Sequence, residues 1–355
     1  MCHPPSPQPP ARRIGQRLPG VLRAMPGLGV GRWLACLDSG FRRNDGEMGT
    51  WDYGKGTQSD GGPHGLAAPR SADPCEDRRM TLAGGRELLA DAERGGYAVP
   101  GFNVSNLELA LGVLDAAEAR RSPVLLQFNP GNLDHFGGVA VAAATARTLA
   151  DSARVPVAVH LDHGHDLELL RAAARAGFSS LMYDGSIKPL DLNIRETREA
   201  AVVALEHGVA LEAELGHVGG REPGVVTSES VLTDPSAARR FVEETQVDAL
   251  AVSVGTAHGL AGTVDLALLR ELRAAVRGLP LVLHGGSGVS PRQLRDCVRA
   301  GIRKLNVSTE IHAAFARAIA GSGDRDPRPA LLEARAAVAA VAGERMDALG
   351  SALRA

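Results

Sequence analysis

Residues 160–166 read HLDHGHD and place three histidines and two aspartates within seven positions. They follow the apolar segment 155–159 (VPVAV), whose composition is typical of a buried strand. Burying a charged group or an imidazole is unfavourable unless a partner compensates for the lost hydration. The pattern therefore predicts that Asp162 and His163, at the end of this segment, hold a ligand or a metal ion.

Two further histidines stand at comparable places. His258 follows the apolar segment 249–254, and His284 ends the apolar segment 280–285. Three neutral imidazoles that converge on one point, with a fourth position open, form the ligand set of a catalytic zinc. A lone histidine is more often a core or surface residue, and for His163, His258 and His284 that interpretation would need three placements to coincide. We interpret three other histidines as such core or surface residues: His135, His207 and His312.

Beyond Met80 the chain alternates short apolar segments with amphipathic segments rich in Ala, Leu, Arg and Glu. The short segments predict eight strands, at residues 97–104, 123–129, 155–162, 179–184, 209–215, 249–254, 280–285 and 302–307. Eight strands that alternate with helices over about 275 residues predict a (β/α)8 TIM barrel of the α/β class. A doubly wound open sheet is the alternative, but its glycine-rich phosphate turn is missing after the first strand, which ends GFNVSN.

Polar side chains stand at the carboxyl ends of the predicted strands. Asp184 ends the fourth strand, and Asn306 ends the eighth. Glu212 and Glu214 lie on the fifth. In a closed barrel these ends converge on one mouth, where barrel enzymes keep their chemistry. We expect His160 to face differently from Asp162 and to be structural or to support the ligands, while the roles of His165 and His217, near the mouth, are open.

Glycine-rich segments follow the last two predicted strands. Residues 284–288 read HGGSG, and residues 306–309 read NVST. The loops after the seventh and eighth strands are the usual phosphate cradle of a barrel, because they offer backbone N–H groups to an anion. A plain tight turn is the alternative for HGGSG. Because a turn would not need two glycines beside a metal ligand, we expect a phosphate site.

A different metal enzyme fits part of the sequence. His163-Gly164-His165 is an HxH pair, as found in barrel hydrolases of the amidohydrolase type. Those enzymes place the pair on the first strand and often use a bridging lysine on the fourth, whereas here the pair follows the third strand. None of the three lysines ends the fourth strand: Lys55, Lys188 and Lys304.

The composition limits the classes of partner. The 355 residues carry a formal net charge of −2, so we expect no nucleic-acid partner and no attraction to an anionic membrane. No apolar run approaches the roughly 20 residues that span a bilayer. The four cysteines show neither CxxC spacing nor a dense framework, which indicates a reducing cytoplasm.

Seven motifs in order resemble those of one enzyme family. They read AVPGFNVSNLE, VHLDHG, LMYDGS, EAELGHVGGRE, VGTAHG, LVLHGGSG and KLNVSTE. Together the motifs resemble the class II, zinc-dependent ketose-bisphosphate aldolases, and most of all the branch with tagatose-bisphosphate and short fructose-bisphosphate aldolases. The resemblance covers the chain from about Met80 to Ile319.

The resemblance implies a metal centre with named ligands. His163, His258 and His284 match the ligands of a catalytic Zn²⁺. Asp184 and Glu214 match carboxylates associated with a second, displaced divalent position. A monovalent cation, Na⁺ or K⁺, near the substrate phosphate is also implied, as is a homo-oligomer, either a dimer or a tetramer.

The resemblance also implies the reaction and its acid–base groups. The reaction is reversible cleavage of a ketose 1,6-bisphosphate, of the fructose or tagatose type, to dihydroxyacetone phosphate and an aldehyde. Asp162 matches the group that exchanges a proton with the oxygen at the reacting bond, and Glu222 matches a mobile-loop glutamate that moves the carbon-bound proton. The implied substrate contacts are Asn103, Gly259, Gly285, Gly286, Ser287, Asn306, Ser308 and Thr309. A non-catalytic barrel that binds sugar phosphates is the alternative, and the presence of Asp162 and every ligand argues against it.

Three departures from the family pattern touch the substrate end. Pro223 follows Glu222 where the family usually has a second acid, and residues 259–262 read GLAG where Tyr and Lys are frequent. Asn129 ends the second strand where serine is frequent. None of these changes touches a metal ligand, so they bear on which sugar is used rather than on the reaction class.

Residues 1–79 differ in composition from the rest of the chain. They hold both tryptophans, three of the four cysteines and ten of the 21 prolines, and they show little periodicity. We interpret them as an unstructured extension or as a mis-assigned start, with a regulatory or targeting arm as the alternative. Residues 80–355 are then the aldolase barrel with its C-terminal helices.

A chain that starts at Met80 is therefore expected to retain the fold and the activity of the full chain, because every motif lies downstream. Circular dichroism and a coupled aldol-cleavage assay on both proteins would measure this. Insolubility of the shortened chain, or loss of its activity with the metal still bound, would show that residues 1–79 belong to the enzyme.

Overall fold

The computed structural model describes residues 82–222, 225–227, 230–257, 262–321 and 325–355. Residues 1–79, predicted to be an extension, lie outside this part, as do His258 and Gly259. For Glu222 the backbone alone is described. The predictions made for these residues therefore stay predictions.

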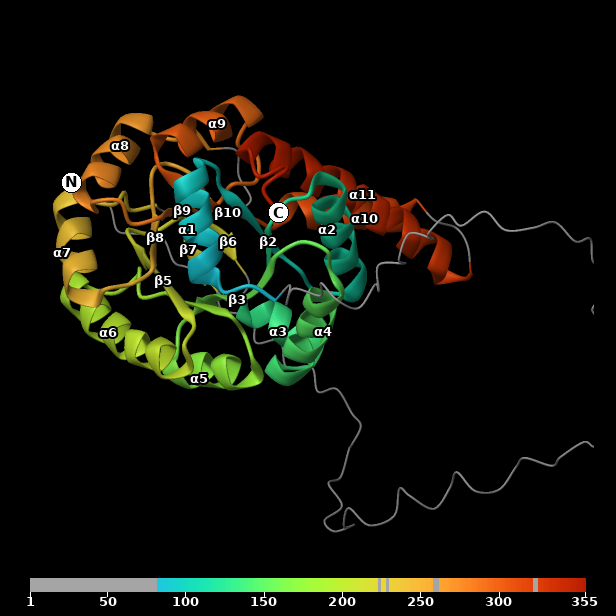
Figure 1. Ribbon diagram of the computed structural model, residues 1–355, viewed down its shortest axis with the longest axis horizontal. Coiled ribbons are helices and arrows are strands. Elements are labelled where there is room, and N and C mark those ends of the chain that lie inside the picture. Colours follow the sequence, from blue (N-terminus) through green and yellow to red (C-terminus); the bar gives the residue numbers. More distant parts are fainter. Residues whose placement is uncertain (1–81, 223–224, 228–229, 258–261, 322–324) are drawn as a thin grey trace, which may run out of the picture. The chain divides into compact units, whose positions relative to one another are not determined.

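Eight parallel strands close into a barrel in the order β1-β10-β9-β8-β5-β4-β3-β2 (Figure 1). Their bounds are β1 (Val99–Asn103), β2 (Val124–Phe128), β3 (Val157–Gly164), β4 (Ser180–Tyr183), β5 (Ala210–Leu215), β8 (Ala249–Val252), β9 (Leu281–Leu283) and β10 (Ile302–Val307). Each overlaps one of the strands predicted from the sequence. The TIM barrel is thus confirmed, and with it the convergence of the strand carboxyl ends on one mouth.

Helices surround the strands in the described part of the chain (Figure 1). They are α1 (Gly85–Gly95), α2 (Leu107–Arg120), α3 (Pro130–Phe136), α4 (Val139–Ser152), α5 (Leu167–Ala176), α6 (Leu190–His207), α7 (Pro235–Thr245), α8 (Leu266–Ala275), α9 (Pro291–Ala300), α10 (Thr309–Ala320) and α11 (Pro327–Leu349). Gly177, Gly208 and Gly301 follow α5, α6 and α9 with positive φ, as expected for glycine C-caps. No helix of the described part is both long and apolar enough to cross a membrane.

Helix α1 closes the end of the barrel opposite the mouth. Leu88 and Ala92 of α1 pack in one buried cluster with Val99, Leu125 and Ala158, which lie at the amino ends of β1, β2 and β3. Figure 1 shows α1 across the centre of the ring of strands. Chemistry inside the barrel can therefore be reached from the mouth only, where the polar strand ends lie.

One excursion from the barrel involves the predicted mobile loop. Strands β6 (Gly220–Glu222) and β7 (Val225–Thr227) pair antiparallel, with Glu222 opposite Val225. The sequence predicted a glycine-rich loop here, and the structure forms a short hairpin instead. The hairpin follows β5, so it leaves the barrel at the mouth and carries Glu222 with it.

The buried thiol of Cys297 gives a direct test of the packing. Cys297 lies on α9 and is 1% exposed. Burial raises the pKa of this thiol to about 12, so the reactive thiolate is absent at neutral pH. The chain from Met80 holds no other cysteine. We expect it to bind no thiol reagent at pH 8 when folded and one equivalent in guanidinium, measured with a chromogenic disulfide. Labelling of the native protein within minutes would contradict the packing of α9.

Candidate metal and acid–base site

Strand β3 delivers two consecutive residues to the mouth. In a regular strand, Asp162 and His163 would point to opposite faces of the sheet. His163 instead has a φ of +47°, and the pairing of β3 with β4 shifts register between Leu161 and Gly164. A non-glycine residue in this left-handed region costs about 1–3 kcal/mol and persists only where the surrounding structure enforces it. The irregularity lets both side chains reach the same polar cluster.

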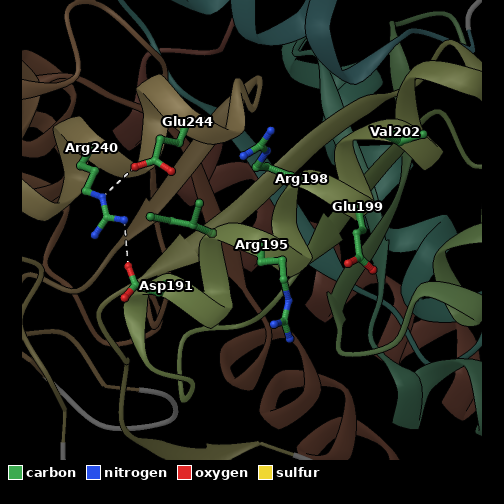
Figure 2. Close-up of a pocket in the computed structure, with 8 residues that line it drawn as sticks. Asp191, Arg195, Arg198, Glu199, Val202, Arg240 and Glu244 are labelled. Atoms are coloured by element: carbon green, nitrogen blue, oxygen red, sulfur yellow. Dashed lines mark hydrogen bonds and ion pairs between the residues drawn. The ribbon is translucent and has the colours of Figure 1, made fainter.

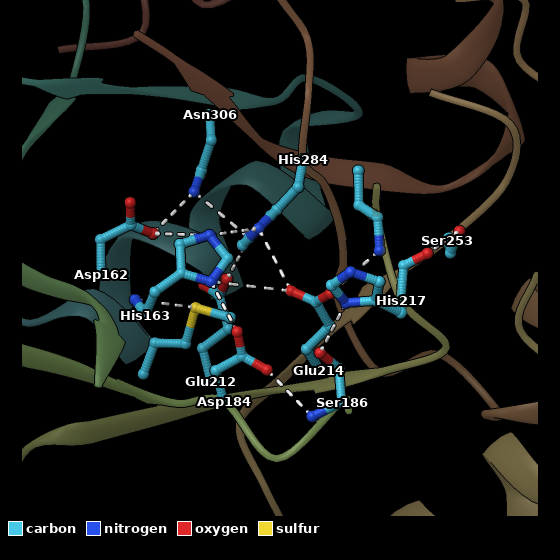
Figure 3. Close-up of polar contacts among 12 residues, drawn as sticks. Asp162, His163, Asp184, Ser186, Glu212, Glu214, His217, Ser253, His284 and Asn306 are labelled. Atoms are coloured by element: carbon cyan, nitrogen blue, oxygen red, sulfur yellow. Dashed lines mark hydrogen bonds and ion pairs between the residues drawn. The ribbon is translucent and has the colours of Figure 1, made fainter. Parts of the chain in front are cut away.

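The rings of His163 and His284 lie edge to face inside this cluster, with their centroids 4.8 Å apart and their planes at 79° (Figure 3). His163 Nε2 lies 3.1 Å from His284 Nδ1. The other nitrogen of each ring meets a carboxylate: His163 Nδ1 is 2.8 Å from Asp184, and His284 Nε2 is 3.0 Å from Glu212. Ionised carboxylates only accept hydrogen bonds, so these outer nitrogens carry the ring protons.

With both rings neutral, the two inner nitrogens are both acceptors. Two lone pairs 3.1 Å apart repel each other unless a proton or a metal cation lies between them. Burial holds the pKa of His284 below its usual value, which keeps that ring neutral. The separation is close to the value of about 3.3 Å for two nitrogen ligands of one tetrahedral zinc. The geometry therefore fits a metal ion, and a proton shared by the two rings is the corresponding metal-free state.

The carboxylates beside the rings remain ionised. Burial raises the pKa of Asp184, but the interactions with His163 and Ser186 together outweigh it and hold that pKa below its usual value. Burial raises the pKa of Glu212 as well, and the charge of Lys304, together with the interactions with His284 and His160, outweighs it. The Asn306 amide nitrogen also lies 3.2 Å from His284 Nε2, but it is itself a donor. We therefore assign the proton on His284 Nε2 to the charged Glu212.

Two overlapping groups of side chains could hold a metal. Asp162, His163 and His284 form one, and His163, Asp184 and Glu214 form the other. In each group the ligand atoms lie within 4.8 Å of one another, and every member is buried. Five of the predicted metal and acid–base residues thus come together, and His163 belongs to both groups.

Asp162 is held by two neutral amides. Asn103 Nδ2 donates to Oδ2 at 2.6 Å, and Asn306 Nδ2 donates to Oδ1 at 2.9 Å. The carboxylate itself is 2% exposed. Hydrogen bonds to the charged form favour that form, so the two amides fix the orientation of Asp162 and stabilise it as a base. Asn103 and Asn306, predicted as substrate contacts, are therefore also supports of Asp162.

A second polar layer lies beneath the mouth. Lys304 Nζ is 2.8 Å from Glu212 Oε2 and 3.4 Å from His160 Nε2, and both Lys304 and His160 have no exposed surface. Burial first, and then the charge of Lys304, lower the pKa of His160 to about 3. His160 is thus a neutral supporting residue, as expected. The expectation that it faces differently from Asp162 is wrong, because residues two apart on a strand share a face.

Two functional residues were missed in the sequence: Lys304 was given no role, and Glu212 was given only a position on the fifth strand. Their spacing from known site residues could have indicated both. Lys304 precedes Asn306 by two positions, and Glu212 precedes Glu214 by two. Since such pairs point into the barrel together, the pattern predicts a polar layer under the mouth.

The glycines of the HGGSG loop have packing reasons of their own. Gly285 has a φ of +64°, and a Cβ there would come within 2.9 Å of the Ala257 backbone. A Cβ on Gly286 would come within 2.4 Å of Leu305. Packing alone therefore accounts for both glycines, and the argument that a turn would not need them is wrong. The phosphate assignment now depends on the position of the loop at the mouth.

The remaining predicted residues are less informative. Ser287 is buried, Ser308 is half-buried and Thr309 is exposed. Asn129, the unusual end of the second strand, caps α3, because its side chain accepts from the Asn132 N–H at 2.9 Å. A helix cap therefore explains that departure without reference to substrate.

The amidohydrolase interpretation finds no support in this geometry. His165 does not join His163 on a common point, because its Nδ1 meets the Asp184 backbone oxygen at 3.2 Å and its side chain is 42% exposed. Lys188 Nζ is already paired, because it lies 2.5 Å from the Glu196 carboxylate and 2.8 Å from the Tyr183 hydroxyl. The described residues thus assemble no HxH pair with a bridging lysine.

A hollow on the outer surface is a different kind of feature. About 360 Å³ in volume, it lies between α6 and α7 and is lined by charged side chains (Figure 2). Arg240 spans it, bonding Asp191 at 2.8 Å and Glu244 at 2.7 Å. Arg240 thus neutralises two of the lining carboxylates, and none of the mouth residues lines the hollow. The barrel mouth is therefore the functional-site candidate.

Comparison with known proteins connects this site to one family. The family model described as fructose-bisphosphate aldolase class-II matches residues 84–354. A fructose-bisphosphate aldolase of Streptococcus pyogenes is 37% identical over 296 residues, which cover 78% of this chain and 100% of that protein. One from Geobacillus stearothermophilus is 38% identical over 256 residues, covering 70% of this chain and 88% of that protein.

Solved structures agree with the sequence comparisons. The crystal structure of the YdjI aldolase from Escherichia coli K12 superposes with a TM-score of 0.70 at 36% identity, covering 77% of this chain and 99% of the other. A putative fructose-1,6-bisphosphate aldolase from Coccidioides immitis gives a TM-score of 0.70 at 31% identity, covering 76% and 97%. These matches span nearly the whole of the two solved structures and about three quarters of this chain.

The Lys304–Glu212 pair gives a stability prediction. Lys304→Met leaves a buried carboxylate without its cation, which is expected to cost about 3–5 kcal/mol in the free energy of unfolding. Adding Glu212→Gln should recover part of this loss, because it removes the unpaired charge. Lys188→Met is the matched control: its ion pair with Glu196 is partly exposed, so it should cost about 1 kcal/mol or less. Urea titration of the wild type, the two single barrel variants, their double variant and Lys188→Met measures this, and additive effects of the two barrel substitutions would contradict the pairing.

Proposed function

Because the chain belongs to the class II fructose-bisphosphate aldolase family, we propose that it is a zinc-dependent aldolase acting on a ketose 1,6-bisphosphate of the fructose or tagatose type. The products are dihydroxyacetone phosphate and an aldehyde, and the reaction is reversible. The observation that carries the proposal is the buried group of Asp162, His163 and His284, whose ligand atoms lie within 4.8 Å of one another, with His163 Nε2 and His284 Nδ1 3.1 Å apart.

The residues present fit a zinc ion. His163 and His284 would hold it through the facing nitrogens, with His258 as the third ligand by family resemblance. Zinc, when bound, supplies a Lewis acid that polarises the substrate carbonyl. Asp184 and Glu214, which group with His163, would serve a second divalent position. A monovalent cation, Na⁺ or K⁺, near the phosphate belongs to the same proposal.

Asp162 performs the proton transfer at the reacting bond. In cleavage it takes the proton from the C4 hydroxyl as the C3–C4 bond breaks, and C4 becomes the aldehyde. The electron pair of the broken bond stays on the ketose fragment as an enediolate. The two amides of Asn103 and Asn306 hold both oxygens of Asp162 in place for this step. A rigid base at a buried position is what general base catalysis requires.

Glu222 completes the reaction in this proposal. It donates a proton to C3 of the enediolate and so forms dihydroxyacetone phosphate. Its place on β6 supports this, because the β6–β7 hairpin leaves the barrel directly after β5 at the mouth. A hairpin attached at its base could close over bound substrate and exclude water.

The substrate phosphate is assigned to the loops after β9 and β10. They supply backbone N–H groups from residues 285–287 and the segment 306–309, and Gly259 is added by family resemblance. The proposal extends to a reducing cytoplasm and to a homo-oligomer, a dimer or tetramer. It includes no nucleic-acid partner.

A substrate screen tests the function. Purified protein, stripped of metal and reloaded with zinc, should cleave at least one of fructose 1,6-bisphosphate and tagatose 1,6-bisphosphate, detected by coupled reduction of dihydroxyacetone phosphate. Activity should disappear with the metal and return with it. Absence of cleavage of both sugars by zinc-loaded protein would refute the proposal.

The division of labour between the two carboxylates can be measured separately. Dihydroxyacetone phosphate can exchange its carbon-bound proton with solvent without any bond cleavage, and this exchange needs Glu222 but not Asp162. Asp162→Ala should therefore lose about 10²–10⁴-fold in cleavage yet retain exchange, while Glu222→Ala should lose both. Deuterium incorporation followed by NMR gives the answer. Equal loss of exchange in both variants would mean that the roles are not divided in this way.

A further inference from the structure

The HGGSG loop is tied to the last helix of the described chain by a partly buried ion pair. Glu310, in the first turn of α10, accepts the Gly288 backbone N–H at 2.7 Å. Arg345 of α11 donates from Nε to one oxygen of Glu310 at 2.7 Å and from Nη2 to the other at 2.5 Å. Arg345 Nη1 donates to the Val289 backbone oxygen at 2.8 Å. Two consecutive residues of the loop are therefore fixed by one arginine and its partner.

The charges of this arrangement matter because of what the loop is proposed to bind. Glu310 lies one residue beyond Thr309 and touches the residue that follows Ser287, so its carboxylate stands beside the proposed phosphate site. An unpaired carboxylate there would repel a phosphate dianion. The Arg345 guanidinium lies bidentate on it, and both side chains are largely shielded, at 13% exposure for Arg345 and 22% for Glu310. Such shielded bidentate pairs are stronger than exposed ones.

We propose that Arg345 is a positioning residue for the phosphate loop, acting through Glu310. It neutralises the carboxylate and holds residues 288 and 289, so that the N–H groups of residues 286 and 287 stay directed at the phosphate. The inference rests on the proposed function in one respect, namely that this loop takes the substrate phosphate. No contact of Arg345 with the reacting atoms is involved.

A second arginine on the same helix provides a matched control. Arg335 of α11 makes a bidentate pair with Asp115 of α2, at 2.5 Å and 2.6 Å. It has the same geometry and the same helix but no contact with the loop. If α11 merely needed its ion pairs for docking, the loss of either arginine would affect the enzyme alike.

Arg345→Met and Arg335→Met are compared in the full-length, zinc-loaded enzyme. Arg345→Met should raise the KM for fructose 1,6-bisphosphate about tenfold and leave kcat within about twofold, because it leaves one uncompensated carboxylate, that of Glu310, beside the bound phosphate. The affinity for inorganic phosphate, measured by ³¹P NMR titration, should fall by the same factor. Arg335→Met should change neither value.

A substitution in the partner separates charge from packing. Glu310→Gln removes the negative charge but keeps an oxygen for the Gly288 N–H. In that background Arg345→Met should change KM by less than about twofold, because no carboxylate remains to be neutralised. A tenfold effect that persists in the Glu310→Gln background would overturn the electrostatic role.

The outcomes distinguish this inference from the proposed function. A wild-type enzyme that cleaves a ketose bisphosphate, with equal KM and phosphate affinity in the two arginine variants, overturns the inference alone. If Arg345→Met binds inorganic phosphate more weakly than the wild type, but the wild type cleaves neither sugar, the loop assignment is supported and the proposed function is overturned.

Discussion

Two imidazole nitrogens held 3.1 Å apart inside a barrel are the constraint on which the site depends. Each nitrogen can point inward only while its ring keeps one orientation. Asp184 and Glu212 hold the two rings, because each accepts the outer proton of one ring and so fixes which nitrogen points inward. The carboxylates thereby orient the ligands before any metal arrives, as partners of metal-binding histidines commonly do.

That arrangement requires support from deeper in the barrel. A buried Glu212 could stay ionised only beside a cation, and Lys304 supplies it from the opposite part of the ring. The same layer holds His160 neutral and out of the metal's reach. Above this layer, neutral amides rather than charges hold Asp162. The mouth therefore combines two oriented imidazoles that can hold a metal with a carboxylate whose two oxygens are held by neutral donors.

Much of this could be predicted from the sequence, and the reason is the barrel itself. Asp162, His163, His284 and Asn306 all end strands, and parallel strands bring their carboxyl ends together without further information. The Lys304–Glu212 pair could not be predicted, because it joins β10 and β5 across the interior. Which side chains come into contact there depends on the tilt and stagger of the strands. The left-handed conformation of His163 and the packing around Gly285 depend likewise on neighbouring loops. Short motifs indicate residue types at a site but not the contacts that support them.

The central claim is that His163 and His284 share one metal ion through their facing nitrogens. Crystals of the protein prepared with one equivalent of zinc, measured on both sides of the zinc absorption edge, test it most directly. The account predicts an anomalous peak between His163 Nε2 and His284 Nδ1, with the outer nitrogens still bonded to Asp184 and Glu212. A peak bound by neither ring, or a fully active crystal form with no zinc between these two nitrogens, would contradict it.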